Sequence, residues 1–404
     1  MWVWRRMTSR GRAVLGLALV FLAAGVITSQ RDLVWVGSFM VVVLSGALFL
    51  VSWPLKGLRH ERHLAATSVP VDESVAVQVI LHSNARGRRL LHFEEVVPRH
   101  MGVRPRFGLS DPTSKRGRNI TYALHASRRG RHQIGPLLVR NLDPFGLATH
   151  DMAFSSVTPL SVTPHVYELS SAGSGTAGDH VTDRSSSSGL VGADDVLVRD
   201  YRPGDEVRRV HWRSTAKIGK LMVRREEQSW SPTTRIVIDN RANAHAGLGM
   251  ASSFEWAVSA AASIGIAMLG ASSRVSLADA EGIRRIPEPR MSASRLLDEL
   301  TDIQLVEADS LETAVSEASS TGVFALLGLL HDADIAALST INTSAASAHA
   351  IVLDVGTFSG AKATTAQKRA AQILAARGWQ VIVADAQTSV PLAWELLNDP
   401  MGAL

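Results

Sequence analysis

The chain has 404 residues, of which 46% are hydrophobic and 20% are charged, and its formal net charge is +5. Such a length can hold about two or three domains with buried cores, so a chain that is disordered throughout is excluded. Cysteine is absent, which excludes disulfide frameworks, thiolate nucleophiles and cysteine-ligated metal centres. The net charge is small for this length and indicates a mild basic bias, not the signature of a nucleic-acid-binding protein.

Two apolar runs stand near the N-terminus, at residues 13–28 and 33–53. As a helix at about 1.5 Å per residue, the second run would be about 31 Å long, which matches a hydrocarbon core of about 30 Å, and the first is slightly shorter. Because only a short polar segment separates them, we expect a transmembrane hairpin over residues 1–60, with helices at about 12–30 and 33–54.

The charges beside these runs predict how the hairpin is oriented. Cations flank both of its ends, whereas the loop between the runs holds one arginine that one aspartate balances. The positive-inside rule then places both ends, and the soluble domains, on the cytoplasmic side of the cell membrane. The alternative for the first run is a cleaved signal peptide, but no small-residue cleavage site ends it and a second apolar run follows at once. The flanking cations are Arg5, Arg6, Arg10, Arg12, Lys56, Arg59 and Arg62.

Residues 65–166 have the pattern of short strands separated by turns. Apolar residues alternate from Val75 to Leu81, and turn signals recur, among them Gly135-Pro136 and the segment from Asp143 to Leu147. We therefore expect a small antiparallel β-sandwich-like domain. Residues 170–190, which are rich in Ser and Gly, indicate a flexible linker.

From residue 233 to residue 404, short apolar strands alternate with helical segments. This order is typical of a doubly wound α/β domain with a parallel sheet. Ligands of such folds bind at the carboxyl ends of the strands. Asp239, directly after the strand at residues 235–238, is expected at that edge.

A densely charged segment lies between the linker and the α/β domain, at residues 194–230. Asp205 is suited to cap a short helix there, and Gly219 is suited to end it in a left-handed conformation. Two roles are open: its aromatic residues pack the junction between domains, or they form a partner-binding surface, since aromatic and arginine residues dominate such surfaces. The residues that carry the pattern are Arg199, Tyr201, Arg202, Pro203, Gly204, Asp205, His211, Trp212, Arg213 and Ala216.

This pattern closely resembles the signature of the domain of unknown function fifty-eight family, in which R-x-Y-x-P-G-D precedes W-[KR]-x-[ST]-A. The resemblance implies an N-terminal transmembrane hairpin, a β-domain with the G-P and D-P-F-G-L turns present here, and a C-terminal von Willebrand factor A-like domain. It also implies association with a MoxR-type AAA+ ATPase and with transglutaminase-like membrane proteins. No settled biochemical activity comes with the resemblance.

The resemblance raises the question of a metal site, because von Willebrand factor A-like domains bind Mg²⁺ through D-x-S-x-S. Here Asp239 keeps the first position, but Arg241 and Asn243 replace the two serines. Since Arg241 would repel a cation and could pair with Asp239, we predict a degenerate site without a functional metal. After a later strand, His331, Asp332 and Asp334 could supply late metal ligands, but we interpret the acids there as solvated loop residues.

Catalytic motifs are also missing: the sequence has no phosphate-binding P-loop, no H-E-x-x-H and no G-x-S-x-G. We therefore expect a membrane-anchored adaptor or scaffold that binds protein partners without a cofactor, and not an enzyme. One alternative is a cryptic hydrolase. Another is an arginine-rich surface of the β-rich domain that binds anionic lipid or nucleic acid. Its residues would be Arg86, Arg88, Arg89, Arg104, Arg106, Arg116, Arg118, Arg128, Arg129 and Arg131.

Overall fold

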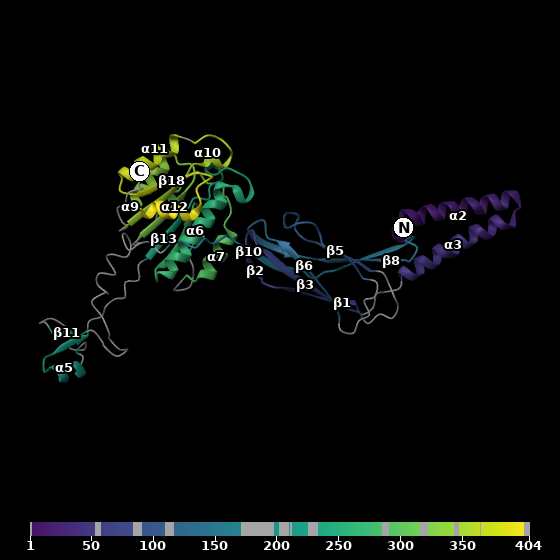
Figure 1. Ribbon diagram of the computed structural model, residues 1–404, viewed down its shortest axis with the longest axis horizontal. Helices are drawn as coiled ribbons and strands as arrows, with labels where there is room; N and C mark the ends of the chain where they lie inside the picture. The colour runs from purple at the N-terminus through teal and green to yellow at the C-terminus, as the bar shows by residue number, and fades with distance from the viewer. Residues whose placement is uncertain are drawn as a thin grey trace. The chain divides into compact units, whose positions relative to one another are not determined.

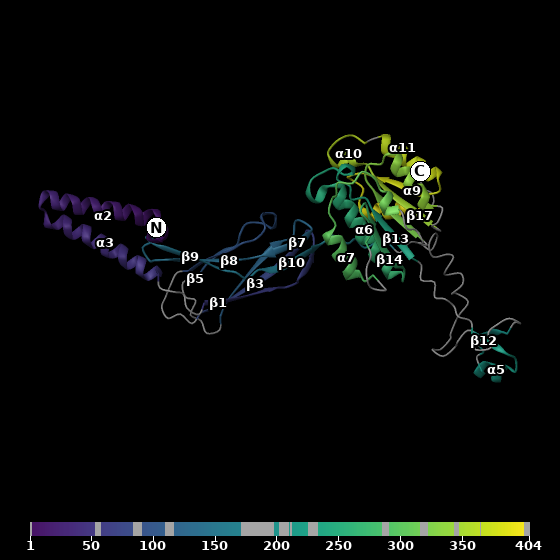
Figure 2. The same cartoon turned by 180° about the vertical axis from the view of Figure 1, so that it is seen from behind.

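The computed structural model divides into two compact units, Met1–His165 and Val166–Leu404 (Figures 1 and 2). Each unit is described by itself. The structure describes residues 2–52, 58–83, 91–109, 117–170, 198–201, 210, 212–224, 233–284, 291–315, 322–342, 347–363 and 365–399. The linker expected at residues 170–190 lies outside these ranges except for its first residue.

Three helices of the described chain are long and apolar enough to cross a membrane, judged by length and composition alone. Two are neighbours near the N-terminus, α2 (Ser9–Thr28) and α3 (Arg31–Ser52), preceded by the short α1 (Trp2–Arg6). The third, α6 (Ser253–Gly270), differs because 61% of it is buried, against 17% and 22% for α2 and α3. Helix α6 is therefore part of a protein core, and the N-terminal pair are the candidate membrane spans.

Small residues let α2 and α3 approach each other closely, as in many membrane helix pairs. A Cβ atom on Gly25 would lie 2.7 Å from Cγ2 of Val34, and one on Gly37 would lie 3.0 Å from the carbonyl oxygen of Ala18. By contrast, a Cβ atom on Gly46 would meet nothing within 4 Å. The two buried glycines are thus needed for the contact.

The rest of the first unit is β-rich and, over the residues that the structure describes, contains three sheets. Their strand orders are β1-β3-β6, β2-β10-β7 and β5-β4-β8-β9. The strands are β1 (Leu58–Leu64), β2 (Ser68–Pro70), β3 (Ser74–Ser83), β4 (Leu91–Glu95), β5 (Arg106–Leu109), β6 (Arg118–His125), β7 (Gly130–Ile134), β8 (Leu137–Leu142), β9 (Thr149–Phe154) and β10 (Thr158–Thr163).

One expectation for this region was wrong: the sheets are not antiparallel throughout, because β2 and β10 run parallel. A parallel pair needs a long connection between its strands, and the whole segment from β3 to β9 lies between these two. The predicted alternation in β3 is present, since Val75, Val77, Val79 and Leu81 are all buried. Arg62 also differs from its expected role as a membrane-flanking cation, because its side chain is buried and its Nη2 lies 2.5 Å from Oε1 of Glu95.

The second unit contains a six-stranded sheet in the order β15-β14-β13-β16-β17-β18. Five strands are parallel, and only the edge strand β15 pairs antiparallel with its neighbour. The predicted alternation of strands and helices is present, although β14, β15 and α12 were not foreseen. The strands are β13 (Thr233–Ile238), β14 (Arg274–Asp279), β15 (Gly282–Arg284), β16 (Gly322–Leu327), β17 (Ser347–Leu353) and β18 (Gln380–Ala384).

Helices cover both faces of this sheet, so its strands are almost wholly apolar. Adjacent residues of β13 point to opposite faces: Ile236 and Ile238 pack with α6, α7 and α12, and Val237 packs with α8, α9 and α11. Figure 1 shows these layers. Besides α6, the helices are α7 (Ala293–Asp302), α8 (Glu312–Val315), α9 (Asp332–Asn342), α10 (Val355–Phe358), α11 (Thr365–Ala376) and α12 (Val390–Asn398).

The packing of the hairpin generates a prediction. Gly37→Leu should destabilise the hairpin by about 1–3 kcal/mol, because the new side chain overlaps α2. Heating the full chain in detergent micelles, followed by size-exclusion chromatography, would measure this as a lower aggregation temperature. Gly46→Leu is the matched control and should leave that temperature unchanged. Equal behaviour of the two variants would contradict the close helix contact.

A second prediction concerns His349 in β17, which is buried and stacked on Phe324 with 4.7 Å between ring centroids. Burial lowers its pKa from 6.5 to about 4. The unfolded chain therefore takes up a proton first, so stability is complete above pH 6.5 and falls as the pH drops towards 4. At about pH 5 the free energy of unfolding should be about 2 kcal/mol lower than at neutral pH.

Hydrogen exchange of the β17 and β18 amides, corrected for its intrinsic pH dependence, would measure this loss. The variant His349→Leu has no titrating group at this position and should lack this contribution to the loss. If the variant and the wild type lost protection equally on acidification, another group would be responsible.

Candidate functional site

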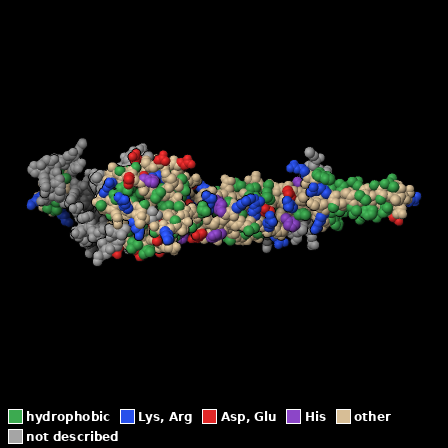
Figure 3. All heavy atoms as spheres, turned by 90° about the horizontal axis from the view of Figure 1, so that it is seen from above, with side chains coloured by type: hydrophobic (Ala, Val, Ile, Leu, Met, Phe, Trp, Pro, Cys, Tyr) green, Lys and Arg blue, Asp and Glu red, His purple; other side chains and the backbone are tan. Residues whose placement is uncertain are grey.

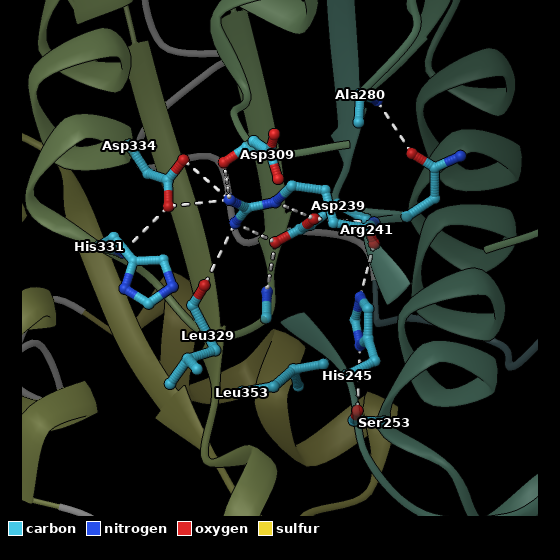
Figure 4. Close-up of polar contacts among 12 residues, drawn as sticks. Asp239, Arg241, His245, Ser253, Ala280, Asp309, Leu329, His331, Asp334 and Leu353 are labelled. Atoms are coloured by element: carbon cyan, nitrogen blue, oxygen red, sulfur yellow. Dashed lines mark hydrogen bonds and ion pairs between the residues drawn. The ribbon is translucent and has the colours of Figure 1, made fainter. Parts of the chain in front are cut away.

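The candidate site lies between β13 and β16, where the strand order of the α/β unit reverses (Figure 4). Asp239 follows β13 directly, as the sequence predicted. Asp334 is in the first turn of α9, which begins after β16. In open α/β sheets this reversal point is where ligands bind. Here the guanidinium group of Arg241 fills the space between the two carboxylates.

Every N–H of the Arg241 guanidinium has an acceptor. Nε donates to Oδ1 of Asp239 at 2.9 Å, and Nη2 donates to Oδ2 of Asp239 at 2.9 Å. Nη1 donates to both carboxylate oxygens of Asp334, at 2.9 and 3.0 Å. The carbonyl oxygens of Leu329 and Asp309 accept the remaining hydrogens, at 3.1 and 3.5 Å. Since an arginine has five donors and no acceptor, the group is saturated.

The cluster is dry. The side chains of Arg241 and Asp239 are 0% exposed and that of Asp334 is 1% exposed. Burial alone would lower the pKa of Arg241, but the hydrogen bonds and charges of the two aspartates more than offset this and raise it. The arginine therefore acts as a permanent internal cation, and its carboxylate partners hold it in bidentate geometry.

Neighbouring residues fix the loop that carries Arg241. The Asn240 amide donates to the carbonyl oxygen of Gln304 at 3.0 Å and accepts from the amide of Ala280 at 2.9 Å. Gly328 lies so close to Ala244 that a Cβ atom would overlap the Ala244 carbonyl group. The strand ends around β13 are thus tied together by side chains that the sequence did not single out.

His245 and Ser253 also lie beside the cluster and bear on the hydrolase alternative. The His245 ring contacts Oγ of Ser253 at 3.0 Å and the backbone carbonyl of Asp239 at 2.6 Å. Ser253 is fully buried, accepts from the amide of Ala246 and donates to the Ala246 carbonyl. A hydroxyl that is buried and bonded in this way does not present a nucleophile to a substrate. The pair joins a loop to the start of α6.

The residues around Asp239 do not fit a divalent metal. The guanidinium stands where a cation would have to reach both carboxylates, and Asn243 is exposed on the short 3-10 helix Ala242–Ala244. Among the described residues, no group of three His, Asp or Glu side chains could hold a metal ion. The interpretation of Asp334 as a solvated loop acid was wrong, because it is buried against Arg241, whereas Asp332 is exposed.

The described part of the signature segment forms a small β-α-β element. Strands β11 (Val198–Asp200) and β12 (Met222–Arg224) pair antiparallel, and α5 (Trp212–Ile218) lies between them in the chain. As predicted, Gly219 ends the helix with a positive φ of 73°. Its amide donates to the carbonyl oxygen of Thr215 at 2.9 Å.

The exposed side of α5 bears on the two roles considered for the segment. Trp212 is 64% exposed, and Arg213 and Ala216 are exposed as well. Tyr201 is half-buried, and its amide donates to the carbonyl oxygen of Leu221 at 2.9 Å. Within the small β-α-β element itself, Trp212 and Ala216 are therefore not packed. The side chain of Arg199 and the residues Arg202, Pro203, Gly204, Asp205 and His211 lie outside what the structure describes.

The β-rich region has a hollow of about 770 Å³ over the β5-β4-β8-β9 sheet. Ion pairs line it: Arg140 makes two 2.8 Å contacts with Asp151, and Glu94 accepts from Arg106 at 3.0 Å. Glu94 also accepts from Arg104, at 3.2 Å. Two arginines of the proposed arginine-rich surface are thus paired with a carboxylate. Arg86, Arg88, Arg89 and Arg116 of that surface lie outside the described residues.

The two apolar N-terminal helices indicate a membrane-associated protein. Besides them, the chain contains a β-rich region and an α/β unit with a saturated internal cation. Residues 197–324 match the family described as Protein of unknown function DUF58. The family resemblance predicted from the sequence is confirmed over these residues.

Among curated proteins, the chain is similar to the "Uncharacterized protein YeaD" of Bacillus subtilis, with 26% identity over 223 residues. The match covers 50% of this chain and 52% of that protein, so the chain spans about half the length of this relative. A conjugative transposon lipoprotein from Bacteroides eggerthii matches 24% of this chain and 97% of its own, at 12% identity and a TM-score of 0.15. Cwp6 from Clostridium difficile matches over 83% of this chain and 47% of its own, at 11% identity and a TM-score of 0.18.

The cluster generates a third prediction. Arg241→Ser should destabilise the α/β unit by about 3–5 kcal/mol, because two carboxylates are left buried without their cation. The variant also restores one oxygen ligand between those carboxylates, so millimolar Mg²⁺ or Mn²⁺ should recover part of the lost stability. Urea unfolding with metal and with EDTA would measure both effects.

The control for this experiment is Arg274→Ser, since Arg274 is exposed at the start of β14. This variant should unfold like the wild type in both buffers. An Arg241→Ser variant that was as stable as the wild type would contradict the structural role of the arginine.

Proposed function

We propose that this chain is a membrane-tethered adaptor that binds protein partners on the cytoplasmic side and carries out no chemistry of its own. Its most direct partner would be a MoxR-type AAA+ ATPase, which supplies the nucleotide hydrolysis for which this sequence has no motif. A transglutaminase-like membrane protein is a further candidate partner. The α/β unit would be a von Willebrand factor A-like domain whose metal an arginine replaces.

One observation carries this proposal. At the point where α/β sheets bind ligands, Arg241 is saturated by Asp239, Asp334 and two backbone carbonyls, and the whole cluster is excluded from water. Such a cluster offers no open coordination position, no accessible acid or base and no space for a substrate. What it can do is hold the neighbouring loops in a fixed arrangement, which is what a docking surface requires.

The exposed residues of the signature segment support the adaptor role. Trp212 is 64% exposed, Ile218 is 54% exposed and Leu221 is 45% exposed, and Arg213 and Lys217 are exposed on the same short helix as Trp212. Exposed aromatic and arginine side chains together are typical of binding hot spots. A partner with an acidic, apolar groove would complement them.

The arginine-rich surface of the β-rich region is the weaker alternative. Binding of nucleic acid or anionic lipid through Arg104 and Arg106 would have to compete with their bonds to Glu94. Few aromatic side chains accompany these arginines, although stacking on aromatics contributes much of single-strand binding. The saturated cluster and the buried Ser253 likewise disfavour a cryptic hydrolase.

A fourth prediction tests the adaptor role through Trp212. Crosslinking in native membranes followed by purification of the full chain should enrich an AAA+ ATPase with the wild type. Trp212→Ala and Arg202→Ala should reduce that enrichment about tenfold, as expected when a hot-spot residue is truncated. Leu305→Ala is the matched control, since Leu305 is also exposed and apolar, at 45%, and lies outside the segment.

Quantitative mass spectrometry of the crosslinked fraction would give the ratio for each variant. If wild type, Trp212→Ala and Leu305→Ala recovered the ATPase equally, the signature segment would not be the contact. If the isolated soluble region converted a substrate without a partner, the adaptor role itself would be wrong.

A further inference from the structure

The turn at residues 143–147 in the first unit is joined directly to the first membrane-span candidate. The Thr8 amide donates to the carbonyl oxygen of Leu147 at 3.0 Å, and the Thr8 hydroxyl contacts the Gly146 carbonyl oxygen at 2.7 Å. The same hydroxyl accepts from the amide of Gly11 and so caps the start of α2. One side chain therefore both begins the helix and holds the turn.

Packing reinforces this junction. Met7, Val51, Leu147 and Ala148 belong to one buried apolar cluster, so the turn contacts the ends of both helices. The Leu147 carbonyl group lies so close to Gly11 that no Cβ atom would fit there. Gly16, one turn further along α2, faces open space instead. The turn is thus fixed at one height along the helix axis.

This height follows from the position of the apolar run. The run begins at Ala13, two residues after Gly11, which corresponds to about 3 Å along a helix. If α2 crosses the bilayer, as the proposed tether requires, the turn lies at the boundary between hydrocarbon and headgroups. Figure 3 shows the hydrophobic side chains of the hairpin, with Lys and Arg side chains gathered where it meets the β-rich region.

The chemistry of the turn suits that boundary. Phe145 is 64% exposed at its tip. The only carboxylate of the turn, that of Asp143, faces inward and accepts from the amides of Phe145 and Ala148 at 2.8 and 2.5 Å. Arg10 lies beside Gly146, with its Nη1 3.9 Å from a Cβ built on that glycine, and Arg10 and Arg12 are exposed. The surface of the turn is therefore apolar at its tip and cationic beside it, and the carboxylate of the turn does not point outward.

We propose that the 143–147 turn is a lipid-binding element, in which Phe145 enters the headgroup layer while Arg10 and Arg12 bind phospholipid phosphates. Aromatic rings favour this layer, and cations near helix ends reach its phosphates. The consequence is that the β-rich region does not rotate freely on its anchor. This surface is distinct from the arginine-rich one considered above, and its lipid contact rests on the proposed membrane tether.

The natural absence of cysteine makes a direct test available, because a single introduced cysteine can carry a spin label. The full chain would be reconstituted in vesicles of phosphatidylcholine and phosphatidylglycerol in equal amounts. Accessibility of the label to oxygen and to a water-soluble nickel complex then reports its depth. Phe145→Cys should be at least about tenfold less accessible to nickel than the control Ser68→Cys, whose site is the exposed first residue of β2. In Figure 1, β2 lies at the end of the first unit opposite the hairpin.

A third label separates failure of this inference from failure of the tether. Val42 is 66% exposed in the middle of α3, so a Val42→Cys label should be accessible to oxygen only. If that label lay in lipid while the Phe145→Cys label were as accessible to nickel as Ser68→Cys, the lipid-binding turn would be refuted and the tether would stand. If the Val42→Cys label were open to nickel, the tether would fail and the inference with it.

A pair of matched variants tests the junction itself. Gly11→Val should push the turn away from α2 and raise the nickel accessibility of the Phe145→Cys label to that of Ser68→Cys. Gly16→Val, on the open side of the same helix, should leave the label protected. Protection that persisted in the Gly11→Val background would show that contact with α2 does not hold the turn at the membrane, which overturns the role of the junction in the inference.

Discussion

The guanidinium of Arg241 lies between the carboxylates of Asp239 and Asp334, and the C-terminal unit depends on this contact. It joins the end of β13 to the start of α9, across the point where the sheet reverses its strand order. Burying these charges is costly, and it is sustained because every donor of the arginine has an acceptor. Because its hydrogen bonds are all made, the arginine holds the end of β13 and the start of α9 together. The cluster leaves no donor of the arginine open to a ligand.

This arrangement gives the two ends of the molecule complementary roles under the proposed function. The N-terminal hairpin, with its buried glycines and the Thr8 junction to the 143–147 turn, would hold the chain at the membrane in one orientation. The C-terminal unit, with its strand ends fastened from within, would offer a surface of constant shape to partners. A tether and a rigid docking unit are what an adaptor needs, and neither requires a cofactor.

Much of this organisation could be predicted from the sequence, because it depends on local patterns. The two apolar runs, the alternation in β3, the left-handed Gly219 and the position of Asp239 after β13 all follow from spacing and residue type. The pairing of Arg241 with Asp239 also follows, since the two are close in the chain.

What the sequence could not supply are contacts between distant segments. Asp334 stands far from Arg241 in the chain and looks like an ordinary loop acid, so only the packing of α9 against β13 reveals its role. The parallel pairing of β2 with β10 and the contact of Gly11 with Leu147 are hidden for the same reason.

The most direct test of the central claim, that Arg241 occupies the space between the two carboxylates, is anomalous scattering from crystals soaked in Mn²⁺. The account predicts guanidinium density and no manganese between Asp239 and Asp334, whereas a manganese peak about 2.2 Å from both carboxylates would contradict it.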